Sequence, residues 1–467
     1  MVMTTMDTKV RISKDSLGEV KVPASAYYGA QTERARQNFP ISGLYLPPRF
    51  IRAQGIIKRA AAIANRDVGE LDREKANAII QAAEEVIHGK WNDQFVVDVY
   101  QAGAGTSQNM NANEVIANRA CELLGGERGD TSLVHPNDHV NMAQSTNDTI
   151  HVAINISAME AITHDLLPSL RHLEDELNEK AKQWDPIIKS GRTHLQDAVP
   201  MRLGQEFSGY ATAVQMRREM IEQVSRRLLL IGLGGNAVGT GINAHPEYSE
   251  RAIAEIAKFT GLPFQKPRNF FTFVQNPDAA VEISGQLRAL AVTLMKIAND
   301  IRLLASGPRT GFAEIQLPAV QPGSSIMPGK VNPVLAEMMN MICYQVLGCD
   351  MTVSSAGSAS QLELNVMMPV IAYNLLHEIN ILATGVRAFT DRCIVGMEAN
   401  EERCRYYAEM STSVATALNP LIGYDKAAEL AKQSFRENKT VREAARETGI
   451  SEQDLDKYLD LREMTGH

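Results

Sequence analysis

Apolar residues recur at helical spacing along most of the chain. Between residues 281 and 306 they follow steps of four and three, at Ile283, Leu287, Leu290, Leu294, Ile297, Ile301 and Leu304. This repeat of 3.5 residues predicts a long helix in a left-handed bundle. A second long helix is predicted from Thr149 to Trp184, because leucines at 166, 170, 173 and 177 keep the same spacing. Pro168 should bend it locally.

A third helix, from Glu206 to Leu230, is predicted to end in a cluster of glycines. Signals for strands are weak, since aromatic residues make up 6% of the chain and no Asn-Gly pair separates alternating apolar runs. We therefore expect an all-α protein with a central bundle of long helices. An N-terminal helical domain (1–145), the central helix-bundle domain (146–397) and a small C-terminal helical domain (398–467) should pack as one body, because no flexible linker separates them.

Composition narrows the functional classes. The 467 residues carry 47 basic and 55 acidic side chains, a net charge of −8, and no basic run, so nucleic acid is not an expected partner. No stretch of 18 apolar residues predicts a membrane span, and the N-terminus lacks the apolar core of a secretory signal. Five cysteines without a Cys-x-x-Cys pair indicate a reducing compartment and no zinc site. We expect a cytoplasmic protein.

Two glycine-rich segments resemble nucleotide-binding motifs only in part. Gly232–Ala237 fits a loose dinucleotide fingerprint, but a helical pattern precedes it, so a turn is favoured and an NAD-linked dehydrogenase is the alternative. Gly323–Pro333 nearly matches a phosphate loop, but five residues separate its glycines and Val331 replaces the metal-binding hydroxyl. A nucleoside triphosphatase is therefore disfavoured.

The Gly323–Pro333 loop still has the composition of an anion site. Two serines and Lys330 precede Asn332 and Pro333, which have the pattern of an N-cap and a first helical residue. Such a loop can present backbone N–H groups, a cation and a helix N-terminus to one anion. The hydroxyl-rich segments 103–107 and 144–148 also precede predicted helices. Three such segments would suit a small dicarboxylate, which needs donors at both ends.

The histidines offer weaker evidence for chemistry. His135 and His139 have the i, i+4 spacing of metal ligands, but Pro136 and Asn137 between them disfavour a helix, so no metal site is expected.

Six motifs together resemble the aspartase/fumarase superfamily. They are AGAGTS (102–107), HPNDHVN (135–141), QSTND (144–148), GRTHLQDAVP (191–200), GSSIMPGKVNP (323–333) and GYDKAAELA (423–431), in the order of that family. The resemblance covers nearly the whole chain. It implies a three-domain all-α fold whose central five-helix bundle assembles into a homotetramer with a twenty-helix core. Each active site would take motifs from three subunits and would need no cofactor.

The resemblance implies a reversible anti-elimination from a small C4 dicarboxylate that gives fumarate. The proton to be removed lies next to a carboxylate, so the carbanion must spread onto that group as a doubly charged aci-carboxylate, which preorganised donors would stabilise. By resemblance Ser324 is the base that takes this proton. Asn147 and His194 would flank the leaving group, and Glu337 would polarise His194.

The remaining site residues implied by the resemblance hold the substrate. The carboxylate that becomes the aci form would be bound by Thr106, Ser145, Thr146 and Ser325. The other carboxylate would be bound by Thr193, Lys330 and Asn332. Substrate-lining positions are also implied for Ala104, Gly105 and Val331. A second, non-catalytic anion site would comprise His135, Pro136, Asn137 and Asp138.

The motifs point to two different leaving groups, ammonia and water. The GAGTS and QSTND motifs favour ammonia released from L-aspartate, whereas the region near Tyr424 leans toward water released from L-malate, which is the alternative. After QSTND the family usually continues with a Phe-Pro-Thr or Tyr-Pro-Thr stretch, whereas Thr149-Ile-His-Val152 follows here. His151 is one turn from Asn147, and packing is favoured over a place in the amino-group pocket. A catalytically silent structural protein is a further alternative, against which Ser324, His194 and Lys330 all argue.

Overall fold

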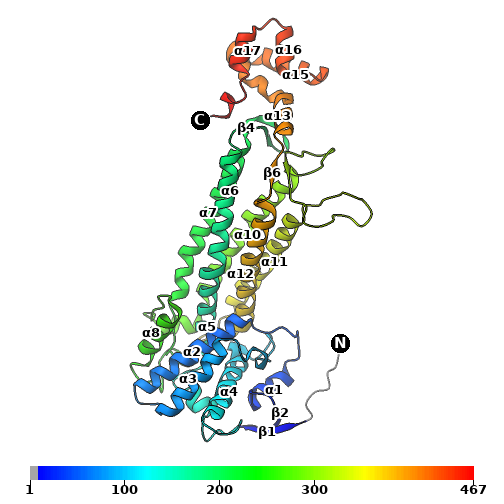
Figure 1. Cartoon of the computed structure of the whole chain (residues 1–467). Helices are drawn as coiled ribbons and strands as arrows, with labels where there is room; N and C mark the ends of the chain where they lie inside the picture. The colour runs from blue at the N-terminus through cyan, green and yellow to red at the C-terminus, as the bar shows by residue number, and fades with distance from the viewer. Residues whose placement is uncertain (1–8, 467) are drawn as a thin grey trace. The chain divides into compact units, whose positions relative to one another are not determined.

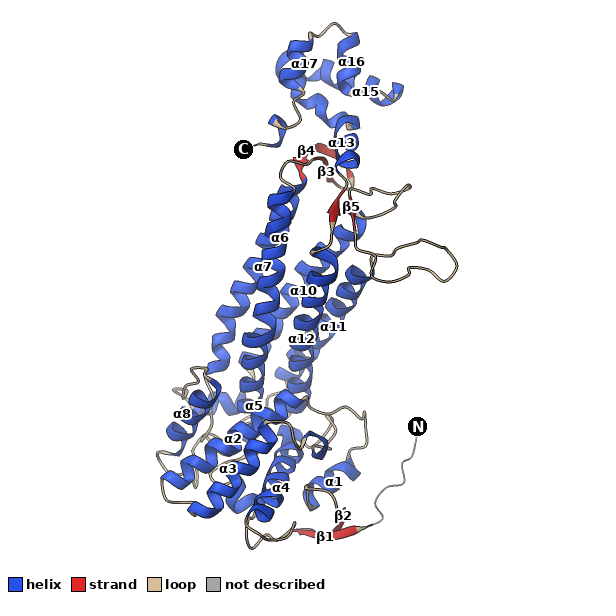
Figure 2. Ribbon diagram, viewed as in Figure 1, coloured by secondary structure: helices blue, strands red, loops and turns tan. Residues whose placement is uncertain are grey.

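The computed structural model describes residues 9–466 and is mainly helical, with 17 α-helices and six short strands in that range (Figures 1 and 2). This confirms the predicted fold class. The chain forms two compact units. Of the described residues, unit 1 consists of 9–167, Met220–Ala289 and Tyr344–Leu382, and unit 2 consists of Pro168–Glu219, Leu290–Cys343 and 383–466. The division into three domains stays a prediction.

Unit 1 contains the N-terminal hairpin and a layer of helices. Its elements are β1 (Val10–Asp15), β2 (Gly18–Pro23), α1 (Ala30–Asn38), α2 (Pro48–Asp67), α3 (Arg73–Ile87), α4 (Thr106–Leu123), α5 (Thr146–Ala161), α8 (Tyr248–Thr260) and α9 (Phe270–Gln275). Four further helices contribute residues to both units. They are α7 (Leu203–Ser225), α10 (Asp278–Leu304), α11 (Val334–Gly357) and α12 (Met368–Phe389).

Unit 2 contains nearly all of α6 and the C-terminal helices. Its elements are α6 (Leu167–Gln183), β3 (Ile188–Thr193), β4 (Gln196–Arg202), β5 (Ile315–Gln316), β6 (Glu398–Ala399), α13 (Glu401–Met410), α14 (Asn419–Ile422), α15 (Tyr424–Glu437), α16 (Val441–Glu447) and α17 (Glu452–Tyr458). The strands form three two-stranded antiparallel sheets, which pair β1 with β2, β3 with β4 and β5 with β6.

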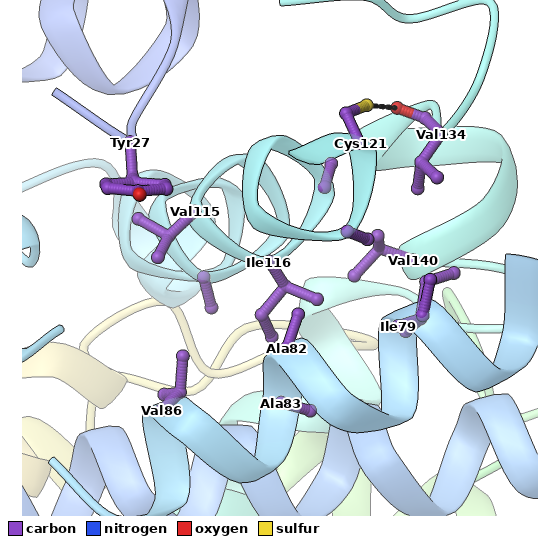
Figure 3. Packing of buried hydrophobic residues seen from close by; sticks show 14 of the residues in the cluster. Tyr27, Ile79, Ala82, Ala83, Val86, Val115, Ile116, Cys121, Val134 and Val140 are labelled. Carbon is purple, nitrogen blue, oxygen red and sulfur yellow. Dashed lines mark hydrogen bonds between the residues drawn. The ribbon is translucent and has the colours of Figure 1, made fainter. Parts of the chain in front are cut away.

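The core of unit 1 is built from small and branched apolar side chains. In Figure 3, Ile79, Ala82 and Val86 of α3 lie against Val115 and Ile116 of α4. The alanine allows the two helices to approach closely, and the branched residues fill the space between them at the density of a protein interior. This packing fixes α4, whose first residue is a candidate substrate ligand.

The periodic apolar positions of the sequence are the buried positions of the long helices. All seven residues of the predicted repeat in α10 are 5% exposed or less. The predicted helix from Thr149 to Trp184 is α5, a π-helical segment at Ile162–Leu166, and α6. The π-helical segment ends two residues before Pro168, which lacks an N–H for the carbonyl one turn earlier. The helical hydrogen bonding therefore changes locally beside the proline, and the predicted bend stays a prediction.

All five cysteines are buried, and burial raises the pKa of Cys343, Cys393 and Cys404 to about 12. Within residues 9–466, no helix is long and apolar enough to cross a membrane.

Candidate active site

The loop from Gly323 to Pro333 in unit 2 is closed at its base by its own backbone. Gly323 N donates to the Lys330 carbonyl at 2.9 Å, and Asn332 Nδ2 donates to the Gly323 carbonyl at 2.6 Å. A Cβ at position 323 would lie 2.2 Å from the Lys330 oxygen, so only glycine fits. The predicted capping role of Asn332 is wrong: α11 begins at Val334, and the Asn332 amide closes the loop instead.

Ser324 occupies a hydrogen-bonded turn within this loop. Its Oγ accepts hydrogen bonds from the backbone N–H groups of Met327 at 2.9 Å and Ile326 at 3.2 Å. Donors that point at an oxygen stabilise negative charge on it and so favour its deprotonated form. Ser325, Lys330 and Val331 lie exposed on the same loop. The geometry therefore suits an oxygen that has to carry charge.

A second part of the candidate site is the tip of the β3–β4 hairpin, also in unit 2. Thr193 pairs with Gln196, and the two residues between them, His194 and Leu195, have φ of 55° and 59°. Two positive φ values in a two-residue loop are typical of a type I′ turn, which normally contains Asn and Gly. Because left-handed backbone is strained for other residues, it persists where the surrounding structure holds it, often at functional sites. Thr193 and His194 are both exposed.

Glu337 lies in the first turn of α11. Over the described range 9–466, no hydrogen bond or ion pair joins it to His194 within the single chain. The pairing of these two residues stays a prediction, as the resemblance places different subunits in one site.

In unit 1, the QSTND motif forms the N-terminus of α5 as a capping box. Ser145 Oγ accepts from Asn147 N at 3.2 Å, and Asp148 Oδ1 accepts from Ser145 N at 2.9 Å. Thr146 is the first helical residue, and Asn147 Nδ2 donates to the Ala237 carbonyl at 2.8 Å. The predicted position of this segment at the start of a helix is confirmed.

Asp148 has a second role, which the sequence did not indicate. Its Oδ2 accepts from the backbone N–H groups of Gly234 and Asn236, both at 2.9 Å. The side chain is fully buried, and this burial raises its pKa to about 6. The glycine cluster therefore anchors α5. It follows the helical segment Arg226–Leu229 and not a strand of a βαβ unit, so the predicted turn is confirmed over the dinucleotide fingerprint.

The start of α4 packs directly on the first turns of α5. Ala104 and Gly105 have φ of 60° and 83°, and Ala104 N donates to the Val366 carbonyl at 2.8 Å. A Cβ on Gly105 would lie 2.7 Å from Ile150 Cδ1. Unit 1 therefore brings the N-terminus that carries Thr106 close to the N-terminus of α5, as two segments binding one carboxylate would require.

A buried lysine joins these two helix starts. Lys58 Nζ donates to Asn109 Oδ1 at 2.8 Å, Gln144 Oε1 at 2.9 Å and Asn141 Oδ1 at 3.0 Å. Burial lowers its pKa to about 7. Lys58 was missed because it lies within an apolar run, and its three partners come from distant positions in the sequence.

The HPND segment forms a short π-helical turn, Pro136–Val140. His135 Nδ1 accepts from the N–H groups of Asn137 and Asp138, while His139 Nδ1 accepts from His135 N at 2.8 Å. Both rings thus act as caps of this turn. In residues 9–466, no group of three or more His, Cys, Asp or Glu side chains is placed to hold a metal ion. The second anion site stays a prediction.

His151 packs inside unit 1. Its Nδ1 lies 3.2 Å from the Asn147 carbonyl, and a Cβ on Gly232 would lie 2.8 Å from its Nε2. Burial lowers its pKa to about 4, so the ring is neutral near pH 7. The ring also lines a cavity of about 250 Å³ beside Phe273. The structure agrees with the packing interpretation.

The comparison with known families decides the identity of the chain. Residues 18–348 match a family model described as "Lyase", and residues 414–466 match one described as "Fumarase C C-terminus". The chain belongs to the fumarate lyase (aspartase/fumarase) superfamily.

Individual relatives of this fumarate lyase fall into two activity groups. The chain is 51% identical to a class II fumarate hydratase of Thermosynechococcus vestitus over 99% of both chains. It is 52% identical to a class II fumarate hydratase of Halobacterium salinarum over 98% of both chains. It is 49% identical to an aspartate ammonia-lyase of a Bacillus species, again over 98% of both chains.

Solved structures show the same fold. A fumarate lyase:delta crystallin from Brucella melitensis, bound to cobalt, has a TM-score of 0.95 at 46% identity and covers 98% of this fumarate lyase and 100% of its own chain. A class II fumarase from Schistosoma mansoni has a TM-score of 0.94 at 38% identity, with 98% and 99% covered.

Proposed function

We propose that this fumarate lyase catalyses the reversible anti-elimination of water from L-malate to give fumarate. The match of its C-terminal residues to a fumarase model and its similarity to class II fumarate hydratases support this substrate. Ammonia release from L-aspartate, which the GAGTS and QSTND motifs favour, is the second candidate. Its support is the 49% identity to an aspartate ammonia-lyase.

The observation that carries the proposal is the environment of Ser324 Oγ. A serine hydroxyl is a poor base unless its alkoxide is stabilised, and two backbone N–H groups already point at this oxygen. In the proposed reaction Oγ takes the proton from the substrate carbon next to a carboxylate. The electron pair moves onto that carboxylate. In the next step this pair returns to form the C=C bond, the C–O bond at the adjacent carbon breaks with its electrons going to oxygen, and the departing hydroxide takes up a proton and leaves as water.

The helix starts in unit 1 would stabilise the resulting aci-carboxylate. Thr106 is the first residue of α4 and Thr146 the first of α5, so the positive ends of two helix dipoles accompany their hydroxyls. Ser145 and Ser325 would add hydroxyl donors. Such donors are most effective when they strengthen as charge develops.

The remaining residues would bind the rest of the substrate. Lys330, Thr193 and Asn332 would hold the second carboxylate, and His194 and Asn147 would flank the leaving group. Because Asn147 Nδ2 donates to the Ala237 carbonyl, its Oδ1 is the atom left for that role. Glu337 would polarise His194. Ala104, Gly105 and Val331 would line the substrate. The reaction needs no cofactor.

We propose further that the protein is a homotetramer in which three subunits complete each site. The long helix α11 supports this, since it exposes Met341 (65%), Tyr344 (60%) and Met351 (68%) along one stripe. A run of large apolar side chains on one helix face is typical of an interface. Sedimentation of the purified protein as a monomer would contradict this assembly.

The deciding experiment compares two substrates. The purified protein is given L-malate or L-aspartate at equal concentration, and fumarate is followed by ultraviolet absorbance. We expect faster turnover of malate. Faster turnover of aspartate identifies an ammonia-lyase instead, and no turnover of either by a stable tetramer supports the structural protein. A fluorescence titration with NADH, in which we expect no change, tests the dehydrogenase alternative.

A further inference from the structure

A buried carboxylate holds the base of the hairpin that presents Thr193 and His194. Arg192 Nη1 lies 2.9 Å from Glu314 Oε1, and Lys189 Nζ lies 3.0 Å from Glu314 Oε2. Both cations come from β3, and the Glu314 side chain is 0% exposed. Each carboxylate oxygen therefore faces a different cation of the same strand.

The backbone and surroundings of Glu314 are also fixed. Its N donates to the Leu304 carbonyl at 3.0 Å, and its carbonyl accepts from Asn400 N at 2.8 Å. The guanidinium carbon of Arg192 lies 4.2 Å from the centre of the Phe312 ring and 5.4 Å from that of Tyr407. The arginine is thus held by an ion pair at its edge and aromatic rings on its faces.

Two attachments along one strand restrict it more than one attachment does. The backbone of β3 is paired with β4, and the ion pairs at positions 189 and 192 attach the resulting hairpin to Glu314 at two points, which restrict both its location and its twist. β3 ends one residue after Arg192, at Thr193, and the strained turn at His194 and Leu195 follows. Strain of this kind needs surroundings that over-determine it, and the exposed tip itself has few contacts.

We propose that Glu314 is a positioning residue, which through Arg192 and Lys189 sets the orientation in which the hairpin presents His194 and Thr193. This inference rests on the proposed function, in which those two side chains face the leaving group and a carboxylate. Glu314 itself touches no substrate. Its loss should therefore act only through the residues at the tip.

The test is a double-mutant cycle between Glu314→Gln and His194→Ala. Glutamine keeps the size of the side chain but removes the charge shared by two cations. We expect kcat/KM of Glu314→Gln to fall roughly 10- to 100-fold, the effect of a small misplacement of reacting groups. In the His194→Ala background the same substitution should cost less than about 3-fold, because coupled residues are not additive.

Glu206→Gln is the matched control. Glu206 Oε2 also pairs with Lys189 Nζ, at 2.5 Å, but it lies on α7 and is 21% exposed. Its loss leaves Lys189 paired with Glu314, so kcat/KM should stay within about twofold of the unaltered protein. If Glu314→Gln does not fold, Arg192→Lys replaces it in the cycle, since this variant keeps the charge but loses the planar contact with Phe312.

The outcomes separate the two proposals. A large loss in the native background and a small one in the His194→Ala background supports the inference. Equal losses in both backgrounds, or a loss below twofold, overturns it while the proposed function stands. If the unaltered protein turns over neither L-malate nor L-aspartate, the proposed function fails and the inference fails with it.

Discussion

Asp148 accepts a hydrogen bond from the backbone N–H of Gly234, with 2.9 Å between Oδ2 and the nitrogen, although the residues are 86 positions apart. This contact fixes the start of α5, which carries Ser145, Thr146 and Asn147. A glycine cluster with the appearance of a cofactor motif thus serves as an anchor for the segment that we propose to bind substrate.

Replacing Asp148 by Asn should weaken both stability and substrate binding. The amide has one acceptor oxygen where the carboxylate has two, so a backbone N–H of Ser145, Gly234 or Asn236 loses its partner. We expect a loss of about 1–3 kcal/mol in the free energy of unfolding by urea. KM should rise by about 10-fold as the segment shifts. Asp72→Asn is the control, because Asp72 also accepts hydrogen bonds from two backbone N–H groups but caps the exposed start of α3. An unchanged KM in Asp148→Asn would refute the anchoring role.

Ser324→Ala should remove the proton-abstracting oxygen and leave the fold intact. We expect kcat to fall by at least about 100-fold, as for the loss of a general base. The elution volume on size exclusion should not change, since the loop is exposed. Ser208→Ala, on the exposed face of α7, should retain full turnover. If Ser324→Ala kept most of its rate, another residue would have to be the base.

His151 should make the protein less stable in acid. Its pKa falls from the ordinary 6.5 to about 4 on folding, so between these values the unfolded chain binds more protons than the folded one. Stability therefore decreases as the pH falls from 6.5 toward 4, by about 3 kcal/mol in total.

The measurement for His151 is urea unfolding at pH 7 and pH 5. His151→Gln, which cannot titrate, should lose about 2 kcal/mol less between these pH values than the unaltered protein. His172→Gln provides the control, because His172 is exposed and pairs with Asp391 at the surface. An equal pH dependence in His151→Gln and the unaltered protein would contradict the prediction.

At position 195, glycine should give a more stable protein than alanine, which is the reverse of their usual order of stability. At φ 59° a Cβ is strained, whereas glycine adopts this backbone freely. Both Leu195→Ala and Leu195→Gly remove the same exposed side chain, but only the second relieves the strain. We expect Leu195→Gly to be more stable by about 1 kcal/mol in chemical unfolding. A more stable alanine variant would show that the turn is not strained in solution.

Local periodicity was sufficient to predict three of the long helical segments, because side-chain burial repeats with the helical turn. The heptad positions of α10 and the leucines of α6 are buried as expected. The β3–β4 hairpin was missed, since its turn contains His194 and Leu195 where the usual signal is Asn-Gly. Family motifs supplied the candidate side chains. The hydrogen bond between Asp148 and Gly234 and the ion pair between Glu314 and Arg192 join distant parts of the chain, and no local pattern in the sequence encodes such pairs.

The burial of every native thiol gives the protein a practical property. A reagent that alkylates cysteine would find each thiol shielded and protonated near neutral pH. Ile326 lies on the Gly323–Pro333 loop, and its side chain is 84% exposed. The substitution Ile326→Cys would therefore create a single reactive thiol. A fluorophore attached there would report a change in the surroundings of the loop on addition of substrate, without removal of any natural cysteine.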